Sequence, residues 1–361
     1  MTQLSSFKAN WCSTPGSSIL DLIEHKNIPK ATLPSLLNIS ISALEDLLNG
    51  FKPIDDHMAE NLSNSIGGSI DFWIKREKQY RDDLKRLQLV PKEEVLKNFD
   101  TEYVIQSFNF FNPKNTEKLF LSFFDTPDFP SWKNKYEMLF QRTLFKKSEK
   151  LDFKKLSLAT WLRAAEIHSK SIVVENLDTS KLIASLDEIK ELTKEKDPKI
   201  FIPLLKDIFA KCGIKFVVLR TPTGCPVSGA IRLYDNNPLL ILSFRFRTDD
   251  HFWFTIFHEI GHLVQHQIDE LYLEKELNEK ETDIIEKEAN LFAERILLSG
   301  LDSTELERFP INHRDLIRRA VRLNISPGIL VGQLQHHGIV SYQHFNNLKR
   351  RYTWEEIFST Q

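Results

Sequence analysis

The sequence predicts a mainly helical protein with one small β-sheet, an α+β domain preceded by an all-helical N-terminal domain. Three observations support this fold class. Glycine-punctuated helical segments fill the N-terminal quarter, β-branched and aliphatic runs gather in a short stretch after residue 213, and helical patterns fill the rest of the 361 residues. We expect four parts: an N-terminal domain at 1–87, a Phe-rich helical connection at 88–210, a core at 211–300, and a basic helical region at 301–361 packing on that core.

The first part is expected to hold five short helices, at 15–25, 30–37, 40–49, 55–66 and from 69 onward. Only Asn38 and Ile39 separate the second helix from the third, as a helix-turn-helix requires. In the connecting region, seven phenylalanines between residues 108 and 129 precede Trp132. Aromatic residues in such number predict a packed core.

Composition places the chain among ordinary globular proteins, with 41% hydrophobic and 27% charged residues. The net charge of -2 gives no reason to expect nucleic acid or an anionic membrane as a partner of the whole chain. No run approaches 18 apolar residues, and the first residues lack the charged and apolar regions of a signal peptide, so we expect a cytoplasmic protein. Three widely spaced cysteines predict neither a disulfide framework nor a Cys-based zinc cluster.

The small sheet is expected from strands at 214–220, 229–234 and 239–244, the last two flanking a turn at Asp235–Pro238. A helix capped by Asp249 and Asp250 follows, with the sequence HFWFTIFHEIGHLVQH. After a polar loop, a second helix has the sequence DIIEKEANLFAERILL.

The HEIGH segment predicts a zinc site. His258 and His262 stand at positions i and i+4, so one helix face presents two imidazoles to one ion, and Glu259 lies beside them as a base for the attacking water. A catalytic zinc takes three protein ligands and leaves a position open. We expect Glu288 on the next helix to be the third ligand, because the adjacent Ala289 allows close helix packing.

Other interpretations of these residues stay open. The two histidines could be satisfied surface residues flanking a carboxylate, because HExxH also arises by chance. Asp283, Glu286 and Glu294 compete for the third position, and Glu286 and Glu288 point about 200° apart on an ideal helix, so they are not expected to bind one ion together. His251 and His266 share the first helix and are expected at the surface or as orienting groups.

With HEIGH, EKEANLFAERILL and the preceding SGAIRLYDNNPLLILSF, the chain resembles the ImmA/IrrE-like metallopeptidases. The resemblance extends to AAEIHSKSI and to ISPGILVGQLQHHG, and so covers most of residues 150–352. It implies a zincin-like fold with zinc held by His258, His262 and Glu288 and with Glu259 as the base.

The same resemblance implies a regulatory zinc-dependent endopeptidase. Its expected substrate is a protein, such as a helix-turn-helix repressor in a mobile element or a stress response. The alternative is a DNA-binding transcriptional regulator or antitoxin whose zinc domain is a sensor without turnover. A catalytic base beside the ligands favours the enzyme, since a structural zinc prefers a closed shell.

The N-terminal segments WCSTPGSSILDLIE and LLNISISALEDLLNG resemble the Xre-type helix-turn-helix of HigA-like antitoxins. This resemblance implies DNA binding, with Ser40, Ser42 and Lys52 as candidate contacts, and a homodimer formed through this domain. Glu45 and Asp46 depart from it, because acidic side chains on the presumed recognition helix would face phosphates. A dimerisation or partner-binding module is the alternative.

The C-terminal region carries the opposite charge. Residues 310–352 contain seven Lys and Arg against Asp315 alone, and Arg314, Arg318 and Arg322 recur along one helix face. We expect either a solvated helix face or a patch that binds a polyanion or an acidic partner.

Overall fold

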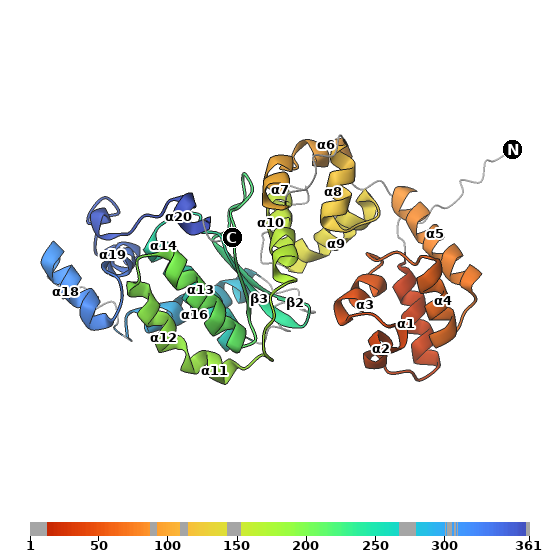
Figure 1. The fold of residues 1–361 in the computed structure, drawn as a ribbon, viewed down its shortest axis with the longest axis horizontal. Coiled ribbons are helices and arrows are strands. Elements are labelled where there is room, and N and C mark those ends of the chain that lie inside the picture. Colours follow the sequence, from red (N-terminus) through yellow and green to blue (C-terminus); the bar gives the residue numbers. More distant parts are fainter. Residues whose placement is uncertain are drawn as a thin grey trace. The chain divides into compact units, whose positions relative to one another are not determined.

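The computed structural model describes residues 13–86, 92–108, 115–142, 153–266, 279–299, 301, 305–306, 308 and 310–358. They form two compact units, residues 1–141 and 142–361, and each is described by itself (Figure 1). Both units are mostly helical, and one three-stranded sheet lies in the second. The predicted fold class, mainly α with a small sheet, is therefore confirmed, while the four-part division of the chain stays a prediction.

All the regular elements in the described residues of the first unit are helices. Its helices are α1 (Pro15–His25), α2 (Leu33–Leu37), α3 (Ile41–Leu48), α4 (Asp56–Ser65), α5 (Ile70–Arg86), α6 (Lys92–Lys97), α7 (Thr101–Phe108), α8 (Thr116–Phe124) and α9 (Phe129–Arg142). Ser40 and Asp55 start α3 and α4, since their side chains accept hydrogen bonds from the backbone N–H groups of Ala43 and Met58. The expected helix at 30–37 is instead a 3₁₀ turn (Lys30–Thr32) followed by α2, and Pro34 occupies the first turn of α2, where it tolerates its missing N–H.

Apolar side chains explain how this unit holds together. Ile19, Leu47, Leu62 and Trp73 from α1, α3, α4 and α5 belong to one buried cluster. A second, aromatic packing involves α8 and α9, where Phe120, Phe123, Phe124 and Trp132 are all fully buried. Three of the phenylalanines in this segment thus form core, as the sequence predicts, while Phe110 and Phe111 lie outside the described residues.

The second unit contains the sheet and its covering helices. Its elements are α10 (Phe153–Ser169), α11 (Thr179–Ala184), α12 (Leu186–Glu191), α13 (Pro198–Lys211), β1 (Lys215–Val218), β2 (Gly229–Tyr234), β3 (Asn237–Leu242), α14 (Asp249–Gln265), α16 (Glu279–Leu297), α18 (His313–Leu323), α19 (Pro327–His336) and α20 (Trp354–Phe358). Short 3₁₀ helices lie at Leu192–Lys194 and Asn346–Leu348. The strand order is β1-β3-β2, with β1 parallel and β2 antiparallel to β3.

Alternation along the strands sends side chains to the two faces of the sheet. Phe216, Ile231 and Leu240 join the large cluster formed with α13 and α14. Arg232, one residue on from Ile231, points the other way and binds Glu166 of α10 at 2.7 Å. The sheet is therefore covered by α14 on one face and by α10 on the other (Figure 1).

The hairpin between β2 and β3 is tighter than the sequence suggests. Asp235 and Asn236 have positive φ angles of 54° and 64°, and Tyr234 pairs with Asn237, so the turn has two residues. Pro238 consequently lies in β3 rather than in the turn. It pairs only with Leu233 of β2, because β1 begins opposite Leu239, so its missing N–H breaks no bond to β1.

Two sequence expectations concern what the chain lacks. Cys212 and Cys225 are free and buried, and Cys12 lies outside the described residues. Within the described ranges no helix combines the length and apolar character needed to cross a bilayer.

Candidate metal centre

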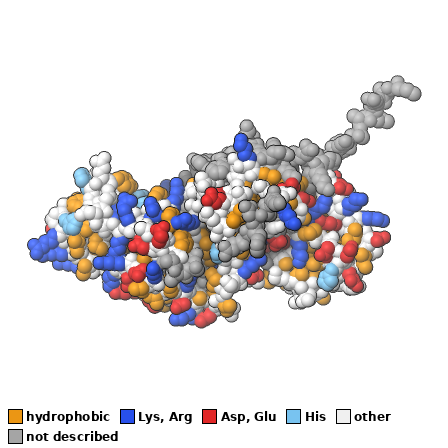
Figure 2. Space-filling view, turned by 45° about the horizontal axis from the view of Figure 1, so that its top comes forward, with side chains coloured by type: hydrophobic (Ala, Val, Ile, Leu, Met, Phe, Trp, Pro, Cys, Tyr) orange, Lys and Arg blue, Asp and Glu red, His pale blue; other side chains and the backbone are white. Residues whose placement is uncertain are grey.

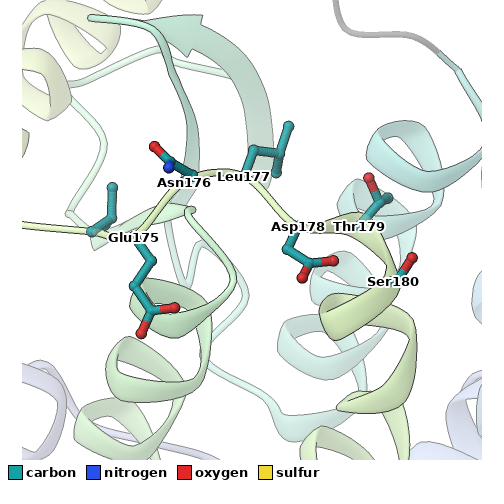
Figure 3. Close-up of a pocket in the computed structure, with 7 residues that line it drawn as sticks. Glu175, Asn176, Leu177, Asp178, Thr179 and Ser180 are labelled. Atoms are coloured by element: carbon teal, nitrogen blue, oxygen red, sulfur yellow. The ribbon is translucent and has the colours of Figure 1, made fainter.

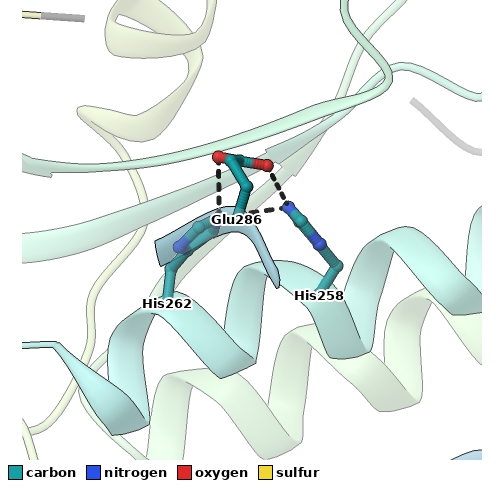
Figure 4. Close-up of side chains that lie close together, drawn as sticks. All are labelled: His258, His262 and Glu286. Atoms are coloured by element: carbon teal, nitrogen blue, oxygen red, sulfur yellow. Dashed lines mark hydrogen bonds and ion pairs between the residues drawn. The ribbon is translucent and has the colours of Figure 1, made fainter. Parts of the chain in front are cut away.

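Two neighbouring helices bring three metal-ligating side chains together. His258 and His262 stand one turn apart on α14, and their Nε2 atoms are 3.1 Å apart. Glu286 of α16 reaches across, with Oε2 3.4 Å from Nε2 of His258 and Oε1 3.4 Å from Nε2 of His262 (Figure 4). Among the described residues this is the cluster of three donors that could hold one metal ion.

The donor spacing fits a zinc ion. Donors about 2.1 Å from a tetrahedral zinc stand about 3.4 Å from one another. The three separations of 3.1 to 3.4 Å agree with that value. Two imidazole nitrogens and one carboxylate are also a donor set that catalytic zinc sites use, because three protein ligands leave one position open.

Asn290 orients one of the histidines, and the sequence interpretation missed it. Its Oδ1 lies 2.9 Å from Nδ1 of His258. An amide oxygen only accepts hydrogen bonds, so Nδ1 carries the proton and Nε2 keeps its lone pair for a metal. Asn290 follows Glu286 by four residues on α16, and this spacing places both on the same helix face.

Electrostatics in the cluster favour a cation beside the carboxylates. The imidazoles of His258 and His262, which hydrogen-bond to Glu286, hold the pKa of its carboxyl well below its usual range. Burial alone would lower the pKa of His258, but the nearby Glu286 and Glu259 outweigh it and raise that pKa. The carboxylate of Glu286 is therefore ionised at neutral pH and available as a donor.

Glu259 lies beside the histidines in a tight, buried place. Its side chain is enclosed between α14 and β2, where the backbone N–H of Ile231 donates to it. A Cβ atom at Gly229 would come within 2.9 Å of Oε1 of Glu259, so only glycine leaves room for this carboxylate. Burial raises the pKa of Glu259, as a proton-transferring carboxylate needs.

The structure places Glu286, not Glu288, at the two histidines. The carboxylate of Glu288 instead lies with Oε2 3.4 Å from Nε2 of His266, near the end of α14. The reason is the rotation of α16 about its axis. Ala289 and Ala293 are fully buried and Ala289 packs against Gly261 of α14, so the face that meets α14 is the one bearing Glu286.

The sequence contains a signal for this orientation of α16. Glu286 precedes Ala289 by three residues and Ala293 by seven, so small residues and the ligand share one stripe, while Glu288 is about 100° from Ala289. Of the other two competitors, the structure describes the side chain of Glu294 alone, and it is not at the cluster. Glu294 pairs with His337 at 3.3 Å, and the side chain of Asp283 lies outside the described residues.

Asp249 and Asp250 form the first turn of α14, after Thr248 at the N-cap position. Oδ1 of Asp249 accepts a hydrogen bond from the backbone N–H of Asp250 at 3.0 Å, so Asp249 satisfies one donor of that turn. Asp249 accepts a 2.6 Å hydrogen bond from Oγ of Ser326, and Asp250 pairs with Nζ of Lys349 at 2.6 Å. These buried contacts attach the C-terminal segment to the beginning of the helix that carries both histidines.

The N-terminal residues that we expect to contact DNA differ in their exposure and in their contacts. Ser40 caps α3, Lys52 is half-buried just after α3, and the side chain of Ser42 lies outside the described residues. Glu45 is exposed, and Asp46 lies 3.5 Å from Nζ of Lys135 within the same unit. DNA binding by this unit stays a prediction.

The basic residues of the C-terminal region separate into two groups. Arg314, Arg318 and Arg322 are exposed on α18, and Figure 2 shows Lys and Arg side chains gathered at the left edge, where α18 lies. Lys349 is buried against Asp250, and Arg350 donates to the carbonyl of Glu195. The three arginines of the candidate patch are thus all exposed on α18.

An open hollow elsewhere on the second unit carries no comparable chemistry. It is lined by residues 174–180, which lead into α11 (Figure 3). Its two carboxylates are already engaged, because Glu175 pairs with Lys181 at 2.8 Å and Asp178 caps α11. The three-donor cluster on α14 and α16 therefore remains the candidate site.

Comparison with known proteins agrees with this location. Residues 217–331 match the family model described as the IrrE N-terminal-like domain, a peptidase family. The matched stretch covers about a third of the chain and includes β2, β3, α14, α16 and α18. No curated protein and no solved structure matches the chain.

Proposed function

We propose that the protein is a zinc-dependent endopeptidase. The observation that carries this proposal is the meeting of His258, His262 and Glu286 at zinc-like spacing beside the buried carboxylate of Glu259. The match of the surrounding residues to a peptidase family supports it independently.

His258, His262 and Glu286 would hold the ion, which would supply Lewis-acid polarisation of the substrate carbonyl and lower the pKa of water. Glu259 accepts a proton from the attacking water and delivers it to the leaving amine. The N–H of Ile231 holds the carboxylate of Glu259 in place, and burial keeps its pKa high enough for it to give the proton back. Asn290 keeps the ring of His258 in the ligating orientation.

We propose a regulatory role with a protein substrate. The resemblance of residues 150–352 to the ImmA/IrrE-like metallopeptidases supports a helix-turn-helix repressor, or a partner in a mobile-element or stress response, as the substrate. The first unit would then select the substrate. The exposed carboxylate of Glu45 on α3 supports a protein partner better than DNA.

The test compares the wild-type protein with Glu259→Gln for zinc content and for cleavage of candidate repressor proteins. We expect one zinc per chain in both proteins and cleavage by the wild type alone, with at least a hundredfold loss in the variant. Zinc in both without any cleavage would favour a regulator whose zinc domain is a sensor. Lack of zinc in the wild type would refute the proposal.

A further inference from the structure

The face of α14 that bears the two histidines continues towards the start of the helix. His251, Thr255, His258 and His262 all lie within about 60° of one another around the axis, and His251 is about 10 Å from His258 along it. Thr255 donates to the carbonyl of His251 at 2.7 Å. This stripe connects the candidate metal centre with residues two turns away.

Gly229 joins the stripe to the beginning of β2. A Cβ atom there would lie 2.5 Å from Cγ2 of Thr255 and 2.9 Å from Oε1 of Glu259. Gly229, Thr255 and Glu259 thus meet at one place. A polypeptide that passes His258 along this stripe continues past Thr255 towards His251.

At the far end of the stripe lies an exposed aromatic surface. Thr255 and His251 line one shallow hollow together with Arg245, Phe246 and Arg247 of the loop before α14. The rings of Phe246 and His251 are stacked, with centroids 4.2 Å apart, and 46% of Phe246 is exposed. A flat aromatic ring pair open to solvent can pack against the carbon chain of a bound side chain.

A positively charged side chain, Arg245, lies beside that surface. The guanidinium of Arg245 lies 5.2 Å from the ring centroid of Phe246 and donates to the carbonyl of Pro226. A carbonyl and a ring do not neutralise the charge, and among the described residues no carboxylate pairs with Arg245. The nearby Asp249 and Asp250 are turned to Ser326 and Lys349.

We infer that Arg245, Phe246 and His251 form a subsite for an acidic side chain of the substrate polypeptide. The inference rests on the proposed peptidase function. An extended chain advances about 3.3 Å per residue, so the 10 Å between His251 and His258 places this Asp or Glu about three residues from the cut bond. Its carboxylate binds Arg245, and its carbon chain packs on the rings.

The test measures peptide binding without cleavage. Zinc-loaded full-length Glu259→Gln protein is titrated with fluorescein-labelled (Ala-Ala-Glu)₄ and (Ala-Ala-Gln)₄, in which every third register offers the residue to the subsite. We expect at least fivefold tighter binding of the Glu peptide and less than twofold discrimination after adding Arg245→Ala. Lys211→Ala, which removes an exposed positive charge at the end of α13, should keep the preference.

Equal affinity of the two peptides for the Glu259→Gln protein would overturn the subsite. So would binding of a labelled (dT)₁₂ oligonucleotide that is tighter than that of the Glu peptide and is lost with Arg245→Ala, because that result would assign Arg245 to nucleic acid. These results do not depend on turnover. Zinc content and cleavage by the wild type test the peptidase separately.

Discussion

Oδ1 of Asn290 lies 2.9 Å from Nδ1 of His258 and so determines which nitrogen of that ring faces Glu286. An outer hydrogen bond of this kind fixes the tautomer and the orientation of a ligating histidine. The contact joins the two helices that carry the candidate ligands, α14 and α16.

Asn290→Ala should therefore weaken zinc binding by about 10- to 100-fold without removing a ligand. Competition with a chromophoric chelator measures the affinity. Asn290→Asp is the matched control, because a carboxylate also accepts from Nδ1 and should retain most of the affinity. Equal zinc affinity of Asn290→Ala and the wild type would show that the contact does not orient His258.

The most direct test of the site compares Glu286 with Glu288 as the third zinc ligand. Glu286→Gln should lose zinc on dialysis, because it removes the charged donor between the two histidines. Glu288→Gln should keep zinc, because the carboxylate of Glu288 lies at His266. Zinc content by atomic emission distinguishes the two, and the reverse result would restore Glu288 as the third ligand.

Close contact between α14 and α16 depends on Gly261. A Cβ atom there would meet Cα of Ala289 at 3.1 Å and Cβ of Phe292 at 3.2 Å. Gly261→Ala should push α16 outward, lowering the free energy of unfolding by about 1 to 3 kcal/mol and weakening zinc binding with it. Denaturant titration measures the first and chelator competition the second. An unchanged free energy of unfolding and an unchanged zinc affinity would mean that α14 and α16 accommodate the added methyl group without loss of stability.

Asp249 should make the free energy of unfolding depend on pH below neutrality. Burial, with the neighbouring Asp250, raises the pKa of Asp249 from 3.8 to about 6, although Ser326 and Arg350 hydrogen-bond to it. Between these two values the folded state binds more protons than the unfolded state. The contribution of Asp249 to stability is therefore fully present below pH 3.8 and is lost as the pH rises through 6.

Asp249→Asn removes this titration. The difference in unfolding free energy between the wild type and Asp249→Asn should decrease from pH 4 to pH 6, with a slope approaching about 1.4 kcal/mol per pH unit. Urea titrations at several pH values measure it. A difference that is constant over this range would show that Asp249 does not titrate there.

The sequence was sufficient for the fold class and for the first two candidate ligands, because their signals are local. A spacing of four residues on a helix places His258 beside His262 whatever the rest of the chain does. The third ligand depends on how α16 is rotated against α14, which packing of Gly261 on Ala289 decides. A single sequence indicates such packing only through the stripe of small residues that contains Glu286.

Contacts between residues far apart in the sequence could not be predicted either, because they too depend on how distant segments pack. Asp249 and Asp250 are residues typical of a helix N-terminus. Their side chains also contact Ser326 and Lys349, which are more than 75 residues away in the sequence. The basic C-terminal region was equally ambiguous. A charge count cannot distinguish Lys349, buried in an ion pair, from the exposed Arg314 of α18.

The attachment of Lys349 and Arg350 to the start of α14 bears on how the protein can be divided for recombinant expression. The stretch that matches the peptidase family ends at residue 331, before either residue. A fragment cut there would leave the buried carboxylate of Asp250 without its ammonium partner and Asp249 without the N–H of Arg350. A minimal expressible fragment that keeps the candidate metal centre must therefore extend beyond residue 350, well past the border that family similarity suggests.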